Sequence, residues 1–218
     1  MVAHLRAVND PDQWNQRGTE SQMATSTRRL GAEDSTTRAA LVDAALQLMI
    51  EGGYAAVTSR QVAAKAGLKP QLVHYYFRTM DDLFLAVFRA GAELNLERQA
   101  RALASDAPLR ALWEFSNDPT GTALMMEFLA LANHHETIRD EIATYAEHFR
   151  RLQADALGGV FKSYGIDSDE FPPLALIVFM SSLSRALNLE STLGVTTGHA
   201  EALALIDKWL ASYEEKRR

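Results

Sequence analysis

The side chains best suited to chemistry in this 218-residue chain lie in one short segment between residues 69 and 75. An ammonium, an amide, an imidazole and a phenol occur there, carried by Lys69, Gln71, His74 and Tyr75. Such groups can bond to phosphate oxygens and to the edges of bases. Pro70 suits the first turn of a helix, because its missing N–H is not needed there. The segment therefore predicts a helix that presents polar groups to the major groove of DNA.

Two short helices joined by a glycine turn are predicted to position these groups. Thr58 can cap the first helix, and Gln61 can reach back to the Thr58 amide to complete a capping box. Gly67 follows the first helix where a tight turn needs positive φ. The apolar sides of the two helices are Val62, Ala63 and Ala66, and Leu72, Val73, Tyr76 and Phe77. This pattern is that of a helix-turn-helix.

The expected contacts with DNA divide into two kinds. Lys69 and Gln71 are expected at base edges, and Arg60 is among those expected to hold the backbone. The whole predicted set is Thr58, Arg60, Gln61, Lys69, Pro70, Gln71, His74, Tyr75 and Arg78. Tyr76 and Phe77 are assigned instead to the core of the unit.

The net charge of −6 is unevenly distributed. Between residues 36 and 79 five bases face two acids, a local charge of +3 that leaves −9 for the rest. Because salt screens charges beyond about 8–10 Å, the local value is the one that DNA would meet. The N-terminal part is thus basic enough to bind DNA.

From Thr36 to about Phe88 the chain resembles the tetracycline-repressor-like (TetR) family of transcriptional regulators. The matching features are the Ala-Ala-Leu-x-Leu helix, the Glu-Gly-Gly-Tyr turn, Thr58, Val62-Ala63, Ala66-Gly67, His74-Tyr75-Tyr76-Phe77 and Asp82-Leu83. The resemblance implies an all-α fold, with a three-helix head that binds DNA and a larger C-terminal helical bundle that dimerises and holds a small molecule. Two features depart from the family pattern: Lys69-Pro70-Gln71 replaces a small or serine-rich start, and Met80 stands where many relatives carry a lysine.

Three regions are predicted along the chain. Residues 1–34 are polar and aperiodic and are expected to form a disordered tail, within which a start at Met23 would make the first 22 residues dispensable. Residues 35–80 form the helix-turn-helix domain, and residues 81–218 the ligand-binding and dimerisation domain. Helices are expected at 37–51, from Thr79 onward, and at 109–116, 120–134, 136–164, 172–190 and 199–215.

Two stripes in the last two helices are expected to form the dimer interface: Leu176, Met180, Leu183, Leu187, Leu203, Ile206 and Leu210. Burial within a single subunit is the alternative explanation for the last helix. Residues 174–180 are apolar on every side, so they are expected to be buried all round.

A largely apolar effector is expected in the body, because thioethers and aromatic rings can line an adaptable cavity. The predicted lining residues are Phe115, Met125, Met126, Leu129, Phe149 and Phe179, and ordinary core packing is the alternative for each. A polar group of the effector could meet His134, His148 or Arg150.

Several classes of function are disfavoured. The chain has no cysteine, and His134 and His135 are adjacent rather than four apart, so neither a metal nor another cofactor is expected. No catalytic motif occurs, so an enzyme is not expected. Neither a membrane span nor a secretory signal is present, which predicts a cytoplasmic protein.

The expected function is that of a repressor, whose partners are operator DNA, the effector and a second copy of the chain. An activator with the same head and a helical interaction module are the alternatives.

Overall fold

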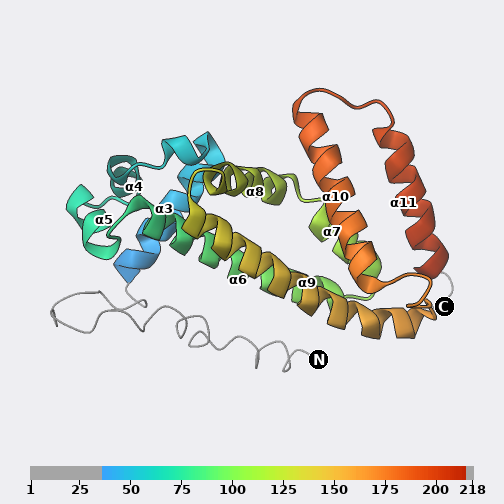
Figure 1. Cartoon of the computed structure of the whole chain (residues 1–218). Helices are drawn as coiled ribbons and strands as arrows, with labels where there is room; N and C mark the ends of the chain where they lie inside the picture. The colour runs from blue at the N-terminus through green and yellow to red at the C-terminus, as the bar shows by residue number, and fades with distance from the viewer. Residues whose placement is uncertain (1–35, 215–218) are drawn as a thin grey trace.

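The computed structural model describes residues 36–214, and all regular structure in this range is helical. The predicted tail and the proposed start at Met23 lie outside the described residues. The head comprises α3 (Thr36–Gly52), the 3-10 helix η1 (Tyr54–Ala56), α4 (Ser59–Lys65) and α5 (Pro70–Tyr76). The body comprises α6 (Met80–Leu103), α7 (Pro108–Ser116), α8 (Pro119–Ala132), α9 (Glu136–Tyr164), α10 (Pro173–Thr192) and α11 (His199–Glu214). Figure 1 shows the head at one end of the molecule, with α10 and α11 at the other.

The helix boundaries agree with those predicted to within about two residues, because the local signals are strong. Four helices begin with a proline in their first turn: Pro70, Pro108, Pro119 and Pro173. The capping box at Thr79 and Asp82 is present in full, with both reciprocal hydrogen bonds, and it starts α6 as predicted. The predicted all-α fold is confirmed.

The capping box predicted at Thr58 is only half formed. The N–H of Gln61 donates to the Thr58 hydroxyl, as expected, at 3.3 Å. The return bond to the Thr58 amide was predicted wrongly, because that N–H donates to Ala56 O at 3.1 Å. The Thr58 hydroxyl instead donates to the Gln61 side-chain oxygen at 2.8 Å, which still ties the two side chains together. The Thr58 N–H, which the capping box needs as a donor, is thus already bonded to the preceding 3-10 turn.

A segment of α6 shortly after its first turn is buried on every side, since the head packs on one side and the body on the other. All six residues from 83 to 88 are buried. They belong to a first hydrophobic cluster that joins α3, α4, α5, α6, α8 and α9. Its members include Leu41, Met49, Val62, Val73, Phe77, Leu83, Phe88, Phe128, Leu131, Ile138 and Tyr145. Head and body therefore share one core, although the predicted boundary at residue 80 coincides with the start of α6.

A second hydrophobic cluster lies at the other end of the body and brings in α7, α10 and α11. It consists of Leu103, Leu109, Leu112, Trp113, Leu157, Val160, Phe161, Tyr164, Ile166, Ile177, Leu187 and Leu210. The long helices α6 and α9 pack together and contribute to both clusters. At about 1.5 Å per residue, the 24 residues of α6 extend about 36 Å, long enough to connect the two.

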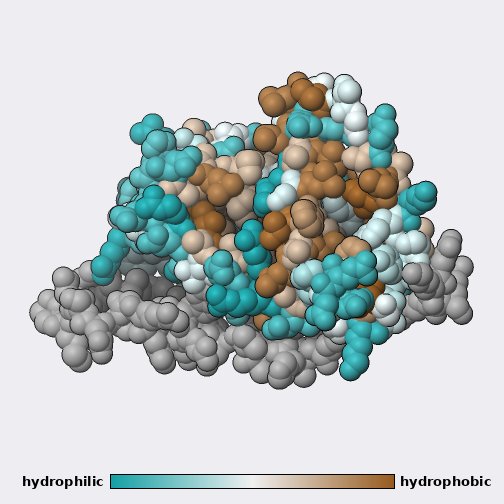
Figure 2. All heavy atoms as spheres, turned by 45° about the vertical axis from the view of Figure 1, so that its right-hand side comes forward, coloured by the Kyte–Doolittle hydropathy of each residue, from teal (hydrophilic) through white to brown (hydrophobic). Residues whose placement is uncertain are grey.

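One expectation about α10 was wrong. Residues 174–180 were predicted to be buried all round, but Leu174, Val178 and Phe179 are 52%, 41% and 71% exposed. The helix packs on α7, α8 and α9 through one side only, the side that carries the buried Ile177. Figure 2, turned so that the end of the molecule with α10 and α11 comes forward, shows hydrophobic atoms gathered on this surface. No helix among the described residues is both long and apolar enough to cross a membrane.

The cap of α6 yields a test of the junction between head and body. Thr79→Ala should lower the free energy of unfolding by about 1 kcal/mol, because the N–H of Asp82 loses its acceptor. Urea unfolding followed by circular dichroism measures the change. Thr137→Ala, at an exposed position near the start of α9, is the matched control and should have little effect. Equal stability of Thr79→Ala and wild type would contradict this account of the junction.

Candidate nucleic-acid interface

The two-helix unit of α4 and α5 separates apolar from polar side chains as its sequence predicts. Val62, Val73 and Phe77 are at most 2% exposed and join the first cluster. Tyr76 is half-buried and packs against the same cluster, so the core role assigned to it and to Phe77 is confirmed. Gly67 forms the turn with a φ of 68°. This packing fixes which side of α5 faces outward.

All of the predicted DNA contacts lie on the surface of the unit. Each of Thr58, Arg60, Gln61, Lys69, Pro70, Gln71, His74, Tyr75 and Arg78 is exposed. Tyr75 is 51% exposed, and its ring stands edge-on to that of Tyr76 with centroids 5.0 Å apart. The half-buried Tyr76 ring therefore orients the exposed one. The structure brings the predicted residues together at the end of the molecule farthest from α10 and α11 (Figure 1).

The cations near this surface differ in their availability. Lys65 forms an ion pair with Glu51 at 2.8 Å, and the Arg38 guanidinium lies over the Phe77 ring at 5.1 Å. Arg60, Lys69 and Arg78 have no ion-pair partner among residues 36–214. Three exposed cations are thus left for an anionic partner. Met80, where many relatives carry lysine, packs against the first cluster and adds no charge.

Two polar contacts that the sequence did not predict lie at the junction of head and body. The backbone N–H of Tyr54, at the start of η1, donates to Glu127 Oε2 on α8 at 2.7 Å. A ring nitrogen of His135, before α9, lies 3.0 Å from the Asp81 carboxylate at the start of α6. Partners 73 and 54 residues apart carry no local signal, so only the tertiary structure reveals them. Both contacts lie where motion of the body would reach the head.

The comparisons with known proteins agree with this geometry. Residues 41–87, from α3 to the buried start of α6, match the bacterial regulatory proteins of the tetR family. The "HTH-type transcriptional regulator BetI" of Rhizobium meliloti (strain 1021) is 32% identical over 132 residues. That alignment covers 56% of this chain and 64% of the relative, so the chain spans less than two thirds of the relative's length.

The head of this chain belongs to the tetR family.

Solved structures of the tetR family type share the fold over most of the chain. A TetR-family transcriptional regulator from Rhodococcus sp. has a TM-score of 0.62 at 20% identity, covering 78% of this chain and 96% of that one. A transcriptional regulator from Saccharomonospora viridis, in complex with choline, has a TM-score of 0.59 at 19% identity, covering 72% and 85%. The named relatives are regulators and not enzymes, which is the class that the missing catalytic motif predicted.

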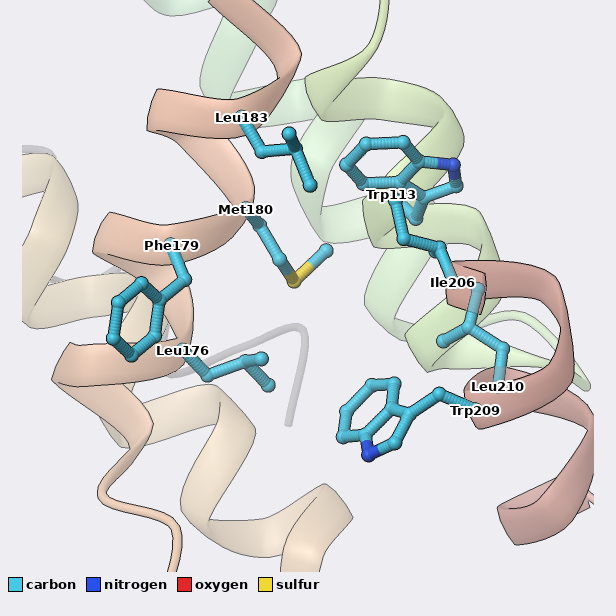
Figure 3. Close-up of a pocket in the computed structure, with 8 residues that line it drawn as sticks. All are labelled: Trp113, Leu176, Phe179, Met180, Leu183, Ile206, Trp209 and Leu210. Atoms are coloured by element: carbon cyan, nitrogen blue, oxygen red, sulfur yellow. The ribbon is translucent and has the colours of Figure 1, made fainter. Parts of the chain in front are cut away.

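The residues predicted to line an effector pocket do not form one group in this chain. Phe115 and Phe149 face each other with ring centroids 6.4 Å apart, and Met125 packs against the first cluster. Met126 is half-buried, and Leu129 is 41% exposed. Phe179 instead lines a hollow of about 150 Å³ at the opposite end of the body. The hollow is lined by Trp113, Leu176, Phe179, Met180, Leu183, Ile206, Trp209 and Leu210 (Figure 3).

The residues predicted for the dimer interface fall into three groups. Leu187 and Leu210 are buried in the second cluster, as the alternative of packing within one subunit requires. Leu183 and Leu203 are 37% and 36% exposed. Leu176, Met180 and Ile206 are half-buried and line the hollow between α10 and α11. The stripes thus pack partly on their own subunit and partly face outward.

The remaining candidates for ligand or metal contact are separated. His134 is exposed, whereas His135 is engaged with Asp81. His148 and Arg150 are half-buried on α9. Within the described part of the chain, no three histidine or acidic side chains are grouped so that they could hold a metal ion.

The contact between α8 and η1 can be tested at Gly53. This residue has a φ of 73°, and a Cβ added there would lie 2.9 Å from Glu127 Oε2. Gly53→Ala should therefore lower the free energy of unfolding by about 1–2 kcal/mol or more. Gly158→Ala, inside α9 with no atom near its added Cβ, should raise stability by about 0.5–1 kcal/mol. Denaturant unfolding measures the free energy of unfolding of both variants. Changes of the same sign in the two variants would contradict the role of the close approach of Glu127 to Gly53.

Proposed function

We propose that this protein is a transcriptional repressor that binds a pseudo-palindromic operator as a homodimer and is released by a small, largely apolar effector. The observation that carries the proposal is the exposed set on α4 and α5, held in place by a buried apolar side. Two copies of α5 would enter successive major grooves, whose centres lie about 34–36 Å apart in such sites. The protein would act in the cytoplasm.

Different residues would supply affinity and specificity. Arg60 and Arg78 have no ion-pair partner among residues 36–214 and favour contacts with phosphate, which hold the unit on the duplex whatever its sequence, whereas Lys69 would contact base edges. Gln71 is exposed on the first turn of α5 and can form a bidentate bond with adenine. A helical interaction module would require His74 and Tyr75 to be buried or in contact with protein, and their exposure favours DNA instead.

The exposed apolar side chains of α10 and α11 support a homodimer. Leu174, Val178 and Phe179 are exposed on α10, and Leu205 on α11 is 69% exposed. Monomeric proteins rarely leave large contiguous apolar patches in water. A second copy that covers the same two helices would bury this surface in an isologous interface. The two heads would then lie on either side of the pair.

Effector release would work through α6. Its first turns are enclosed by the head and its later turns by the body, so a shift of the helix would move the head with it. The contacts of Glu127 with η1 and of His135 with Asp81 would transmit motion of α8 and α9 in the same way. A change in the separation of the heads would lose the fit to half-sites. The choline complex of the Saccharomonospora viridis protein supports small-molecule binding in a body of this fold.

Selection of bound fragments from the source genome tests the proposal as a whole. Enrichment of a pseudo-palindromic site is expected, followed by lower transcription from its promoter when the protein is present. Higher transcription from that promoter would identify an activator. Recovery of no sequence above random competitor would overturn the proposal.

Two substitutions separate backbone contact from base contact on the selected site. Arg60→Ala should weaken binding to all sequences and reduce the log–log salt slope by about 0.9, because one phosphate contact is lost. Gln71→Ala should cost about 1–3 kcal/mol at one or two positions of the site and relax the preference there. Fluorescence anisotropy across salt concentrations and site variants measures both.

The matched controls are Arg101→Ala and Gln47→Ala, at exposed positions on α6 and α3. Both should bind DNA as wild type does. An unchanged salt slope for Arg60→Ala would remove Arg60 from the backbone contacts, and unchanged site preference for Gln71→Ala would remove Gln71 from the base contacts.

The dimer is tested at Phe179, the most exposed large apolar side chain of α10. Phe179→Glu should convert the dimer to a monomer, because an unpaired charge would be buried in an apolar interface. Light scattering coupled to gel filtration measures the mass. Leu94→Glu, at a 51% exposed position on α6, should leave the dimer intact. A dimeric Phe179→Glu protein would place the interface elsewhere.

A further inference from the structure

Two glutamines are buried where α6 and α9 pack together in the middle of the body. Gln99 of α6 is 3% exposed, and Gln153 of α9 is 7% exposed. On α6, Leu96 and Leu103 lie three and four residues away on the same face, in contact with the first and second clusters. On α9, Phe149 and Leu157 each lie four residues from Gln153 and likewise contact the first and second clusters. The glutamines therefore form a polar layer between the two hydrophobic clusters.

The side-chain nitrogen of Gln99 is enclosed and has no hydrogen-bond partner among residues 36–214. Buried donors are nearly always paired, since an unpaired one loses its bonds to water without replacement. An apolar residue of the same shape would avoid that loss. An unpaired buried amide lowers the stability of the fold. Its presence is explained if its N–H donates a hydrogen bond to a bound molecule.

Other polar groups near this layer are already engaged. Asn95, one turn before Gln99, donates to the Tyr145 hydroxyl at 3.4 Å, which in turn donates to Ala92 O at 3.2 Å. Burial raises the pKa of Tyr145 to about 12, against a smaller opposite effect of Asn95, so the phenol keeps its proton. Arg98 is held by Asp118 at 2.8 Å. Gln99 thus differs from Asn95, Tyr145 and Arg98 in having a donor with no partner among residues 36–214.

Aromatic rings surround the same level of the body. The Phe115 ring of α7 lies 5.7 Å from the Arg98 guanidinium and 6.4 Å from the Phe149 ring. Phe149 also stacks on Tyr145 at 5.5 Å. A flat apolar molecule would find ring faces here and one hydrogen-bond donor. The hollow in Figure 3, by contrast, offers only apolar side chains and the two indoles of Trp113 and Trp209.

We propose that Gln99 holds the effector by donating a hydrogen bond to its oxygen, and that the effector carries a carbonyl group on a flat apolar frame. It would lie between α6 and α9 beside Phe115 and Phe149. The effect of this bound molecule on DNA binding rests on the proposed function, because a molecule bound here would displace α6.

Two probes of nearly equal shape test the hydrogen bond: acetophenone, which has a carbonyl, and ethylbenzene, which has none. In thermal unfolding of the full chain, acetophenone should raise Tm saturably and by more than ethylbenzene at equal concentration. With ¹⁵N-labelled glutamine, the side-chain signal of Gln99 should shift with acetophenone alone. That signal is assigned by its loss in Gln99→Met.

The variant Gln99→Met keeps the shape of the side chain and removes the donor. Without any probe, its Tm should rise by about 2–4 °C, as an unpaired buried group is lost. It should respond equally to acetophenone and ethylbenzene. Gln47→Met, at an exposed glutamine of α3, is the matched control and should keep the wild-type preference for acetophenone.

Equal responses of the wild type to both probes, an unmoved Gln99 signal, or a preference that survives in Gln99→Met would each overturn the inference. These measurements contain no DNA, so they are independent of the fragment selection. If the probes fail as described but the fragment selection recovers a site, the Gln99 site is refuted and the repressor is supported. If the probes behave as expected but the fragment selection recovers no site, the Gln99 site is supported and the repressor is refuted.

Discussion

The enclosure of the first turns of α6 is the constraint on which the rest of the structure depends. Six successive residues, 83–88, are buried because the head covers one side of the helix and α8 and α9 cover the other. A helix apolar all round is stable only when it is surrounded. The head therefore cannot separate from the body without exposing this core, and any displacement of α6 reaches α4 and α5 through packed side chains.

The apolar side chains of the molecule form three groups. The first cluster fixes the head on the body, and the second holds α7, α10 and α11 on the far end of α6 and α9. The exposed side chains of α10, with Phe179 foremost, remain for a partner. Between the clusters, the buried Gln99 and Gln153 interrupt the apolar interior.

Electrostatics in the head depends on which cations are already paired. Lys65 is bound to Glu51 and Arg38 lies on Phe77, so the local charge of +3 counted along the chain does not describe the surface itself. Arg60, Lys69 and Arg78 are the cations that stay available. The acidic remainder of the chain repels DNA from the body and favours approach by the head.

Local signals in the sequence determined the helices and the polar side of α5. Prolines, glycines and caps act within a few residues of themselves, so the helix ends and the exposure of Gln71 and Tyr75 followed from pattern alone. Only the tertiary structure decided what covers each helix: it left Phe179 in the open, joined Glu127 to the Tyr54 amide and enclosed Gln99. These outcomes depend on residues up to 73 positions apart, whose proximity no local periodicity encodes.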